Sequence, residues 1–194
     1  MAQRGAYAKG VAKREEILEA ALAVVAERGY RKASVKEIAD ASGLSPAGLL
    51  HYFGSKEELF VAILEARDAR DTREVESVGF MGAFLAALRH NAAVPGLVHL
   101  YARLAVDAAD PEHPANEYFR TRTVQLEELA RDTIVAAQAS GEIRADVDPV
   151  WVMRSAHALA DGLQTAWMLD PTIDMAADVE EFLRVLRPTP DGEA

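Results

Sequence analysis

Hydrophobic residues recur at helical spacing along almost the whole chain. Over residues 9–28, apolar side chains repeat every three or four positions, and Gly29 follows where the repeat stops. This spacing predicts an amphipathic helix that ends at a glycine. Further helices are predicted at residues 55–78, 80–92, 96–108, 115–140, 149–169 and 174–186. Because no segment alternates apolar and polar residues as a strand does, we expect an all-α fold.

The polar residues between 34 and 58 mark helix starts and a tight turn. The capping signals are Ser34 with Glu37, Ser45 with Pro46, and Ser55 with Glu58. A serine followed three residues later by a glutamate caps the first turn of a helix, and proline suits the first helical position. Gly43 can adopt the positive φ that ends the first of these helices, so that the next one departs at a steep angle. This spacing is typical of a DNA-binding helix-turn-helix.

The same segment resembles the N-terminal domain of the TetR family of transcriptional regulators. The positions in register with the family pattern are Ser34, Ile38, Ala39, Gly43, Leu44, Ser45, Leu49, Tyr52, Phe53, Ser55, Lys56 and Leu59, while Leu50 stands where the family usually has Tyr. The resemblance implies a three-helix DNA-binding domain at residues 1–54, with a flexible basic arm at about 1–9, and a larger helical effector-binding and dimerisation domain at 55–194. It also implies a homodimeric repressor that binds a palindromic operator in double-stranded DNA and is released by a small-molecule effector.

The net charge of −10 is divided unevenly along the chain. Residues 1–36 hold eight Lys and Arg against four Glu, which gives +4, whereas residues 68–194 carry −11. Phosphate binding needs local positive charge, and an acidic body is repelled by DNA. The asymmetry suits a basic DNA-binding domain joined to a larger acidic domain. Taken alone, however, it is better explained as ordinary solubilising charge.

The first residues of the second helix of a helix-turn-helix read base edges, while helix N-termini and polar side chains hold phosphates. Here those first residues are small, and they are Ser45, Pro46, Ala47 and Gly48. They allow close approach but no bidentate contact, so we expect operator choice to depend on DNA shape and on the basic segment 4–14. Lys36 and His51 are expected to reach bases or nearby phosphates. The resemblance implies phosphate contacts for Tyr52 and Lys56, although Tyr52 could instead pack on the first helix.

The predicted helix at 149–169 carries only two charged residues, so it must be covered on more than one side. One face is bulky and apolar, and a second consists of the small residues Ser155, Ala158, Gly162 and Thr165. The following helix offers Val179, Phe182 and Leu186. Two such helices from each subunit would form a four-helix dimer interface, as the resemblance also implies. The remaining polar stripe fits a solvent edge, an interfacial hydrogen-bond network or part of a ligand pocket, and it consists of Arg154, His157, Asp161 and Gln164.

The resemblance places the effector among the central helices of the larger domain. Candidate pocket residues are Phe84, Leu88, Leu97, Tyr101, Leu104, Phe119, Arg122 and His157. For any single aliphatic residue of this set, ordinary core packing is the simpler interpretation. Tyr101, Arg122 and His157 are better candidates for orienting groups, because their burial requires partners that a ligand could supply.

Composition argues against several other classes of protein. The chain has no cysteine, no run of about 18 apolar residues and no apolar signal-peptide core at its N-terminus, so we expect a cytoplasmic protein without a membrane partner. The acidic residues and His113 within 107–113 are interpreted as a polar loop, and no catalytic or phosphate-binding motif is found. We expect no enzyme activity, no cofactor and no metal. The alternatives are a helical protein-interaction module, which does not explain the capped helix starts, and less readily an enzyme.

Overall fold

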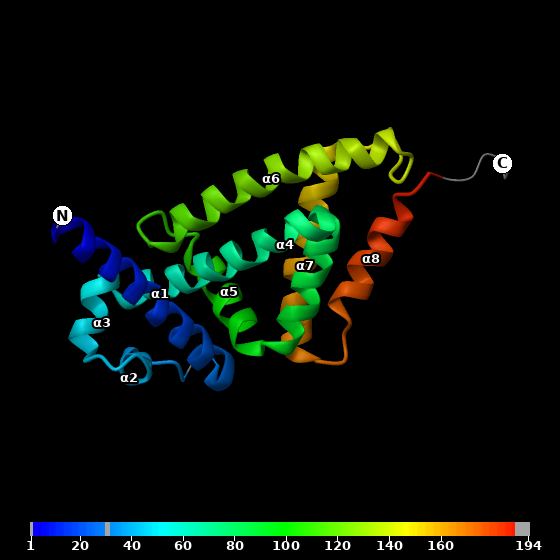
Figure 1. The fold of residues 1–194 in the computed structure, drawn as a ribbon. Coiled ribbons are helices and arrows are strands. Elements are labelled where there is room, and N and C mark those ends of the chain that lie inside the picture. The colour runs from blue at the N-terminus through cyan, green and yellow to red at the C-terminus, as the bar shows by residue number, and fades with distance from the viewer. Residues whose placement is uncertain (1, 30–31, 189–194) are drawn as a thin grey trace. The chain divides into compact units, whose positions relative to one another are not determined.

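The computed structural model describes residues 2–29 and 32–188, and it describes the side chains of residues 10–29, 32–69 and 81–188. Within this part of the chain the backbone forms helices and no strand (Figure 1). The helices are α1 (Ala2–Arg28), α2 (Val35–Ala41), α3 (Pro46–Phe53), α4 (Lys56–Ala93), α5 (Pro95–Asp107), α6 (Ala115–Ala139), α7 (Pro149–Leu169) and α8 (Met175–Val185). The predicted all-α fold, with a helix-turn-helix near the N-terminus, is confirmed.

Short polar side chains begin several of these helices. Each capping side chain accepts a hydrogen bond from a backbone N–H of the first turn, and the caps are Ser34 before α2, Ser45 before α3, Asp148 before α7 and Asp174 before α8. Glycines follow α1 and α2, and the φ angles of Gly29 and Gly43 are 74° and 68°. Only glycine adopts such angles without strain, so the sequence signals and the observed helix boundaries agree at both places.

The segments predicted as separate helices at 55–78 and 80–92 form one helix. α4 continues from Lys56 to Ala93, and the predicted break near residue 79 is wrong. Gly79 and Gly82 each disfavour a helix by about 1 kcal/mol relative to alanine, which weakens the sequence pattern without stopping the helix. At the other end of the chain, α1 begins at Ala2, so the backbone of residues 2–9 is helical. The flexible basic arm expected at about 1–9 stays a prediction.

Packing divides the chain into two compact units. The first unit is the chain up to Arg70 together with Val94–Tyr118, and the second is Asp71–Ala93 together with the chain from Phe119 onward. α4 therefore contributes to both units. The predicted division between residues 54 and 55 concerns function, and it stays a prediction.

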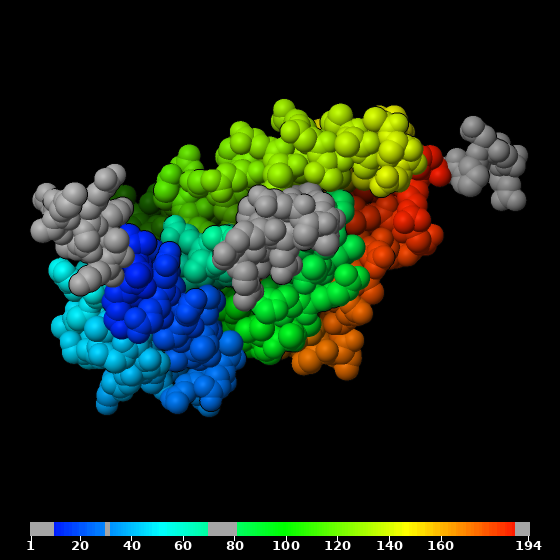
Figure 2. Space-filling view, viewed as in Figure 1, coloured from blue at the N-terminus to red at the C-terminus, as the bar shows by residue number. Residues whose placement is uncertain are grey.

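The core of the first unit joins α1 to the helix-turn-helix and to α5. Its fully buried side chains include Ile17, Val25, Ile38, Leu49 and Leu59. α5 approaches α1 so closely that a Cβ atom at Gly96 would lie 1.8 Å from the carbonyl oxygen of Val25. Glycine is thus required at the second position of α5. Figure 2 shows α1, α2 and α3 packed as one continuous body within this unit.

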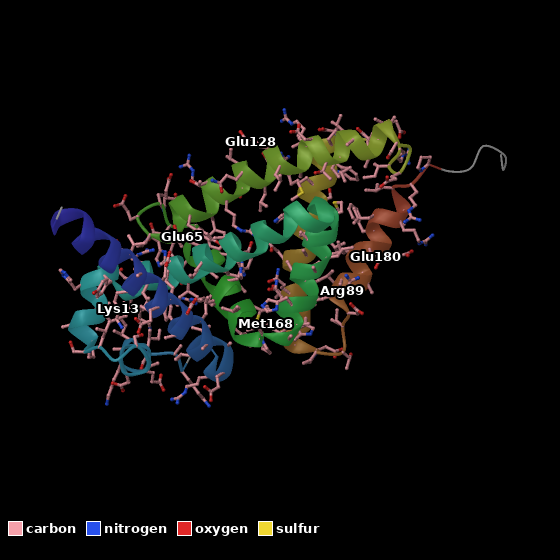
Figure 3. The ribbon with its side chains drawn as sticks, in the orientation of Figure 1. Lys13, Glu65, Arg89, Glu128, Met168 and Glu180 are labelled. Carbon is pink, nitrogen blue, oxygen red and sulfur yellow. The ribbon has the colours of Figure 1, made fainter. Side chains whose placement is uncertain are left out.

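In the second unit, α7 packs against both α8 and the second half of α4. Leu88 of α4, Ala160 of α7 and Val179 of α8 share one buried cluster. A second cluster consists of Ile134, Ile143, Val152 and Leu186. At the surface, Arg89 of α4 and Glu180 of α8 form an ion pair at 3.6 Å, and Figure 3 shows the two side chains turned toward one another.

Candidate DNA-binding and effector sites

The turn between α2 and α3 is closed by backbone and side-chain hydrogen bonds. The backbone N–H of Leu44 donates to the carbonyl oxygen of Ala39 at 2.8 Å. The buried Ser42 hydroxyl donates to the carbonyl oxygen of Ile38 at 2.7 Å. Together with the positive φ of Gly43, these bonds fix the direction in which α3 leaves α2. The predicted helix-turn-helix geometry is therefore present.

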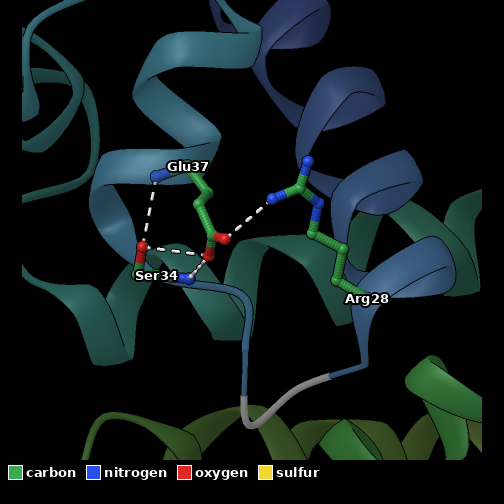
Figure 4. A network of polar contacts seen from close by, with 3 residues as sticks. All are labelled: Arg28, Ser34 and Glu37. Carbon is green, nitrogen blue, oxygen red and sulfur yellow. Dashed lines mark hydrogen bonds and ion pairs between the residues drawn. The ribbon is translucent and has the colours of Figure 1, made fainter.

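The N-terminus of α2 is held by Ser34, Glu37 and Arg28 (Figure 4). Ser34 Oγ accepts from the backbone N–H of Glu37 at 3.2 Å, and Glu37 Oε2 accepts from the backbone N–H of Ser34 at 2.9 Å, so the predicted capping box is confirmed. Arg28, the last residue of α1, forms an ion pair with Glu37 at 2.9 Å. Hydrogen bonds from Ser34, and then from Arg28, lower the pKa of Glu37. The start of α2 is thereby tied to the end of α1.

The C-terminal end of α2 is held by Lys13 of α1. Its Nζ donates to the carbonyl oxygen of Ser42 at 3.1 Å and forms an ion pair with Glu16 at 2.7 Å. A cation at a helix C-terminus satisfies an unpaired carbonyl and opposes the negative end of the helix dipole. Lys13 belongs to the basic segment that we expected to contact DNA, yet in the structure it orients α2. Nothing in the local sequence signals this contact, because the two residues are far apart in the chain.

The start of α3 presents a small and exposed surface. Ser45 Oγ accepts from the backbone N–H of Gly48 at 3.1 Å, and Pro46 occupies the first turn. Ser45, Pro46 and Ala47 are exposed, whereas Gly48 is half-buried. Leu49 and Phe53 are buried on the opposite face and anchor the helix. The predicted reading residues thus share one outward surface.

The other predicted DNA contacts differ in their surroundings. Lys36, His51 and Lys56 are exposed, and Lys56 Nζ lies 5.2 Å from the centre of the Phe60 ring. Tyr52 is half-buried, and its ring meets that of His51 edge-on at 6.1 Å. Tyr52 also lines an open groove of about 450 Å³ whose other walls are Arg14, Phe53, Glu58, Val61, Ala62, Glu65 and Pro114. Arg14 of α1 lies over the Phe53 ring at 4.9 Å, a contact that the sequence did not suggest.

Arg67 forms a buried charged cluster in the first unit. Its side chain is 4% exposed and forms an ion pair with Asp68 at 3.0 Å. Its guanidinium group lies 5.0 Å from the centre of the Tyr101 ring, and the Tyr118 hydroxyl donates to Asp68 at 2.6 Å. Tyr101, which was predicted to orient an effector, therefore packs on a cation of its own unit. The cluster joins α4 to α5 and to the first turn of α6.

Three of the predicted effector-binding residues meet in the second unit. The rings of Phe84 and His157 stack with centres 5.3 Å apart and an angle of 24°. Arg122 Nη1 lies 3.5 Å from His157 Nε2. Of the remaining candidates, Leu88 is in the adjacent apolar cluster and Phe119 is half-buried. The last three lie on α5 in the first unit, where all are buried, and they are Leu97, Tyr101 and Leu104.

The polar stripe on α7 contains both exposed and buried residues. Arg154 and Asp161 are exposed, and Arg154 forms an ion pair with Glu127 at 3.6 Å. His157 is half-buried, whereas Gln164 is buried. The solvent-edge interpretation therefore fits Arg154 and Asp161 but not Gln164.

The small-residue face of α7 points outward from the chain. Ala158, Gly162 and Thr165 are exposed and Ser155 is half-buried, and a Cβ atom at Gly162 would meet nothing within 4 Å. Large apolar residues at the two ends of this face, Trp151 and Leu169, are exposed as well. On α8, Phe182 is half-buried, and its ring lies 6.5 Å from that of Trp151.

Two of the residues predicted for the dimer interface are buried inside their own chain. Val179 packs with Leu88 and Ala160, and Leu186 packs with Val152. Their side chains are therefore part of this chain's core, and a partner could not contact them directly. The error arises because a hydrophobic stripe on a short helix does not indicate whether it faces its own chain or another one.

The acidic segment before α6 forms a hydrogen-bonded loop. Asp110 Oδ1 accepts from the backbone N–H of Glu112 at 3.0 Å, and His113 Nδ1 accepts from that of Ala115 at 3.1 Å. In the part of the chain that the structure describes, no group of three or more His, Asp or Glu is arranged to hold a metal ion. None of the described helices is long and apolar enough to cross a bilayer.

A helix-turn-helix whose second helix is exposed, joined to a body of long helices, defines a DNA-binding regulator. The family model for bacterial regulatory proteins of the tetR family matches residues 17–63. KstR2 of Mycobacterium tuberculosis, an HTH-type transcriptional repressor, is 28% identical over 155 residues, which are 73% of this chain and 74% of that protein. Residues 17–63 thus match the tetR family model, and most of the chain is similar to a transcriptional repressor.

Solved structures have the same fold. A TetR transcription regulator from Haloarcula marismortui has a TM-score of 0.74 and 24% identity, and the match covers 92% of this chain and all of that one (100%). Thermus thermophilus FadR, a TetR-family repressor solved with lauroyl-CoA, has a TM-score of 0.60 and 21% identity over 93% of this chain and 100% of that one. The similar proteins are transcriptional regulators and not enzymes, so the chain is a DNA-binding regulator.

Proposed function

We propose that the protein is a homodimeric repressor that binds an operator in double-stranded DNA through α3 and leaves it when a small molecule binds the helical body. The observation that carries this proposal is the exposed start of α3 beside an α2 that α1 holds at both ends. A recognition helix must keep its position when it enters the DNA groove, and these contacts supply that rigidity.

The proposed contacts follow from exposure and chemistry. The first turn of α3 approaches the base edges, and it consists of Ser45, Pro46, Ala47 and Gly48. Lys36 and His51 reach bases or adjacent phosphates, while Tyr52 and Lys56 contact phosphates. Because none of the small residues makes a bidentate base contact, DNA shape contributes much of the selectivity. A DNA-binding regulator works where the DNA is, so we place the protein in the cytoplasm.

Dimerisation is supported by the outward face of α7. Ala158, Gly162 and Thr165 allow a second helix to approach closely, and the exposed Trp151 and Leu169 offer apolar area at both ends. An isologous contact through this face would present two copies of α3 to one duplex. Effector binding is supported by the group of Phe84, Arg122 and His157, and FadR, which has a similar fold, was solved with lauroyl-CoA.

Selection of duplexes from a random-sequence pool tests DNA binding, followed by titration of the selected duplex at several salt concentrations. We expect a palindromic product and an affinity that falls as salt rises. Lys56→Ala should weaken binding and reduce the salt slope by about 0.9 for each phosphate that the variant no longer neutralises, with the dimer intact. Arg131→Ala, on the exposed side of α6, is the matched control and should leave the affinity and the salt slope unchanged. If no duplex is retained even at low salt, the chain is a protein-interaction module instead.

A further inference from the structure

Gln164 is a buried amide that lacks a hydrogen-bond partner. It lies on α7 in the second unit and is 6% exposed. Among the buried side-chain oxygen and nitrogen atoms of the described residues, only its Oε1 has no hydrogen-bond partner. Buried polar atoms almost always have partners, because burial removes their bonds to water. An orphaned acceptor at this position therefore points to a partner that is not part of the chain.

α4 carries a second buried amide, Asn91, whose level on the helix pair follows from the register of α4 and α7. Phe84 stacks on His157, and one turn later Leu88 and Ala160 share a cluster, so α4 and α7 advance together along this contact. Figure 1 shows the second half of α4 running alongside α7. Continuing the same register by one more turn brings Asn91, which is 8% exposed, to the level of Gln164.

A carboxamide presents a hydrogen-bond acceptor and a donor side by side. Its complement is a group that offers an N–H next to a C=O, and this bidentate pairing is analogous to the one by which Asn and Gln recognise adenine. A carboxylate cannot donate to Oε1, and an apolar group leaves it unsatisfied. We infer that Gln164, with Asn91 beside it, binds an uncharged amide of lactam type on the effector. This inference rests on the proposed effector binding and specifies the chemistry of that site.

The full-length protein can be tested with two fragments that differ by one hydrogen-bond donor. The probes are 2-piperidone and N-methyl-2-piperidone, and their dissociation constants are measured by ligand-observed NMR. We expect wild-type protein to bind 2-piperidone about tenfold more tightly, which is the effect of one net hydrogen bond. Equal binding of the two probes, or no binding of either, would overturn the inference.

Variants at Gln164 separate recognition from structure. Gln164→Met keeps the size of the side chain and removes its polarity, so the two probes should bind equally while the melting temperature of the free protein does not fall. Gln125→Met, on the exposed side of α6, is the matched control and should keep the tenfold preference. A Gln164→Met protein that retains the preference, or that melts several degrees lower, refutes the assignment.

Binding of the selected duplex is measured on the same preparations. Failure of the fragment test with intact DNA binding overturns this inference alone. Conversely, an intact lactam preference in a protein that binds no duplex overturns the proposed function alone.

Discussion

Replacing Gly96 by alanine tests the packing of α5 on α1. A methyl group at this position would start 1.8 Å from the carbonyl oxygen of Val25 and must move outward by about 1.6 Å to reach ordinary contact at 3.4 Å. The Cβ atom and the carbonyl oxygen are both fixed by the backbone and cannot rotate away. α5 would therefore shift as a whole, together with its buried Leu97, Leu100 and Leu104.

The size of the effect follows from known costs of overpacking. Forcing extra atoms into a packed core costs about 1–3 kcal/mol, and a contact with a backbone atom places Gly96→Ala near the upper value of about 3 kcal/mol. For a protein of this size each kcal/mol lowers the melting temperature by about 2–4 °C, so the expected fall is about 6–12 °C. Calorimetry at one fixed protein concentration measures it, because the proposed dimerisation would make the melting temperature concentration-dependent.

A second glycine in a helix provides the control. A Cβ atom at Gly10 in α1 would meet nothing within 4 Å, so Gly10→Ala should stabilise the protein by up to about 1 kcal/mol through helix propensity. Opposite signs for the two substitutions support the close approach of α5 to α1. If Gly96→Ala melts at the wild-type temperature, the reasoning about this contact is refuted.

Three further substitutions probe the cap, the buried cation and the outward face of α7, and a fourth serves as a control. The pKa of Glu37 is lowered in the folded state, so its stabilising effect is present above its ordinary pKa of 4.5 and is lost as the pH falls through the lowered value. The Glu37→Gln protein should therefore be less stable at neutral pH, and its free energy of unfolding, measured with urea at several pH values, should fall less steeply as the pH is lowered. An unchanged fall toward acid pH would contradict this. Asp68→Asn leaves the buried Arg67 without its carboxylate and should cost about 2 kcal/mol in urea unfolding, and an unaltered midpoint would contradict the cluster. Ala158→Glu should yield folded monomers in analytical ultracentrifugation, whereas Val179→Ala should lower the free energy of unfolding by about 1–2 kcal/mol and keep the dimer.

Local signals predicted the elements that local physics determines. Ser34 with Glu37, Ser45 with Pro46, and Gly43 act within a few residues of chain, and each is found in its expected role. The continuity of α4 was missed because a glycine lowers helix propensity by an amount that a long packed helix readily outweighs.

Contacts between distant residues were not predictable from one sequence. Lys13 on Ser42, Arg67 under Tyr101 and the burial of Val179 depend on how helices pack, and no spacing rule encodes them. The grouping of Phe84, Arg122 and His157 was expected as part of a larger set, yet the sequence did not separate these residues from those on α5. Gln164 was assigned only to a polar stripe, because periodicity could not indicate that it is the buried member of that stripe.

The outward residues at the start of α3 take no part in the core, and this has an evolutionary consequence. Ala47 is exposed, whereas folding depends on Leu49 and Phe53 behind it and on the Ser45 cap before it. If α3 reads base edges as proposed, replacing Ala47 by asparagine, glutamine or arginine would add a base-reading group at little cost to stability. Descendants of this gene could thus acquire new target promoters through a change at one codon while the rest of the protein stays as it is.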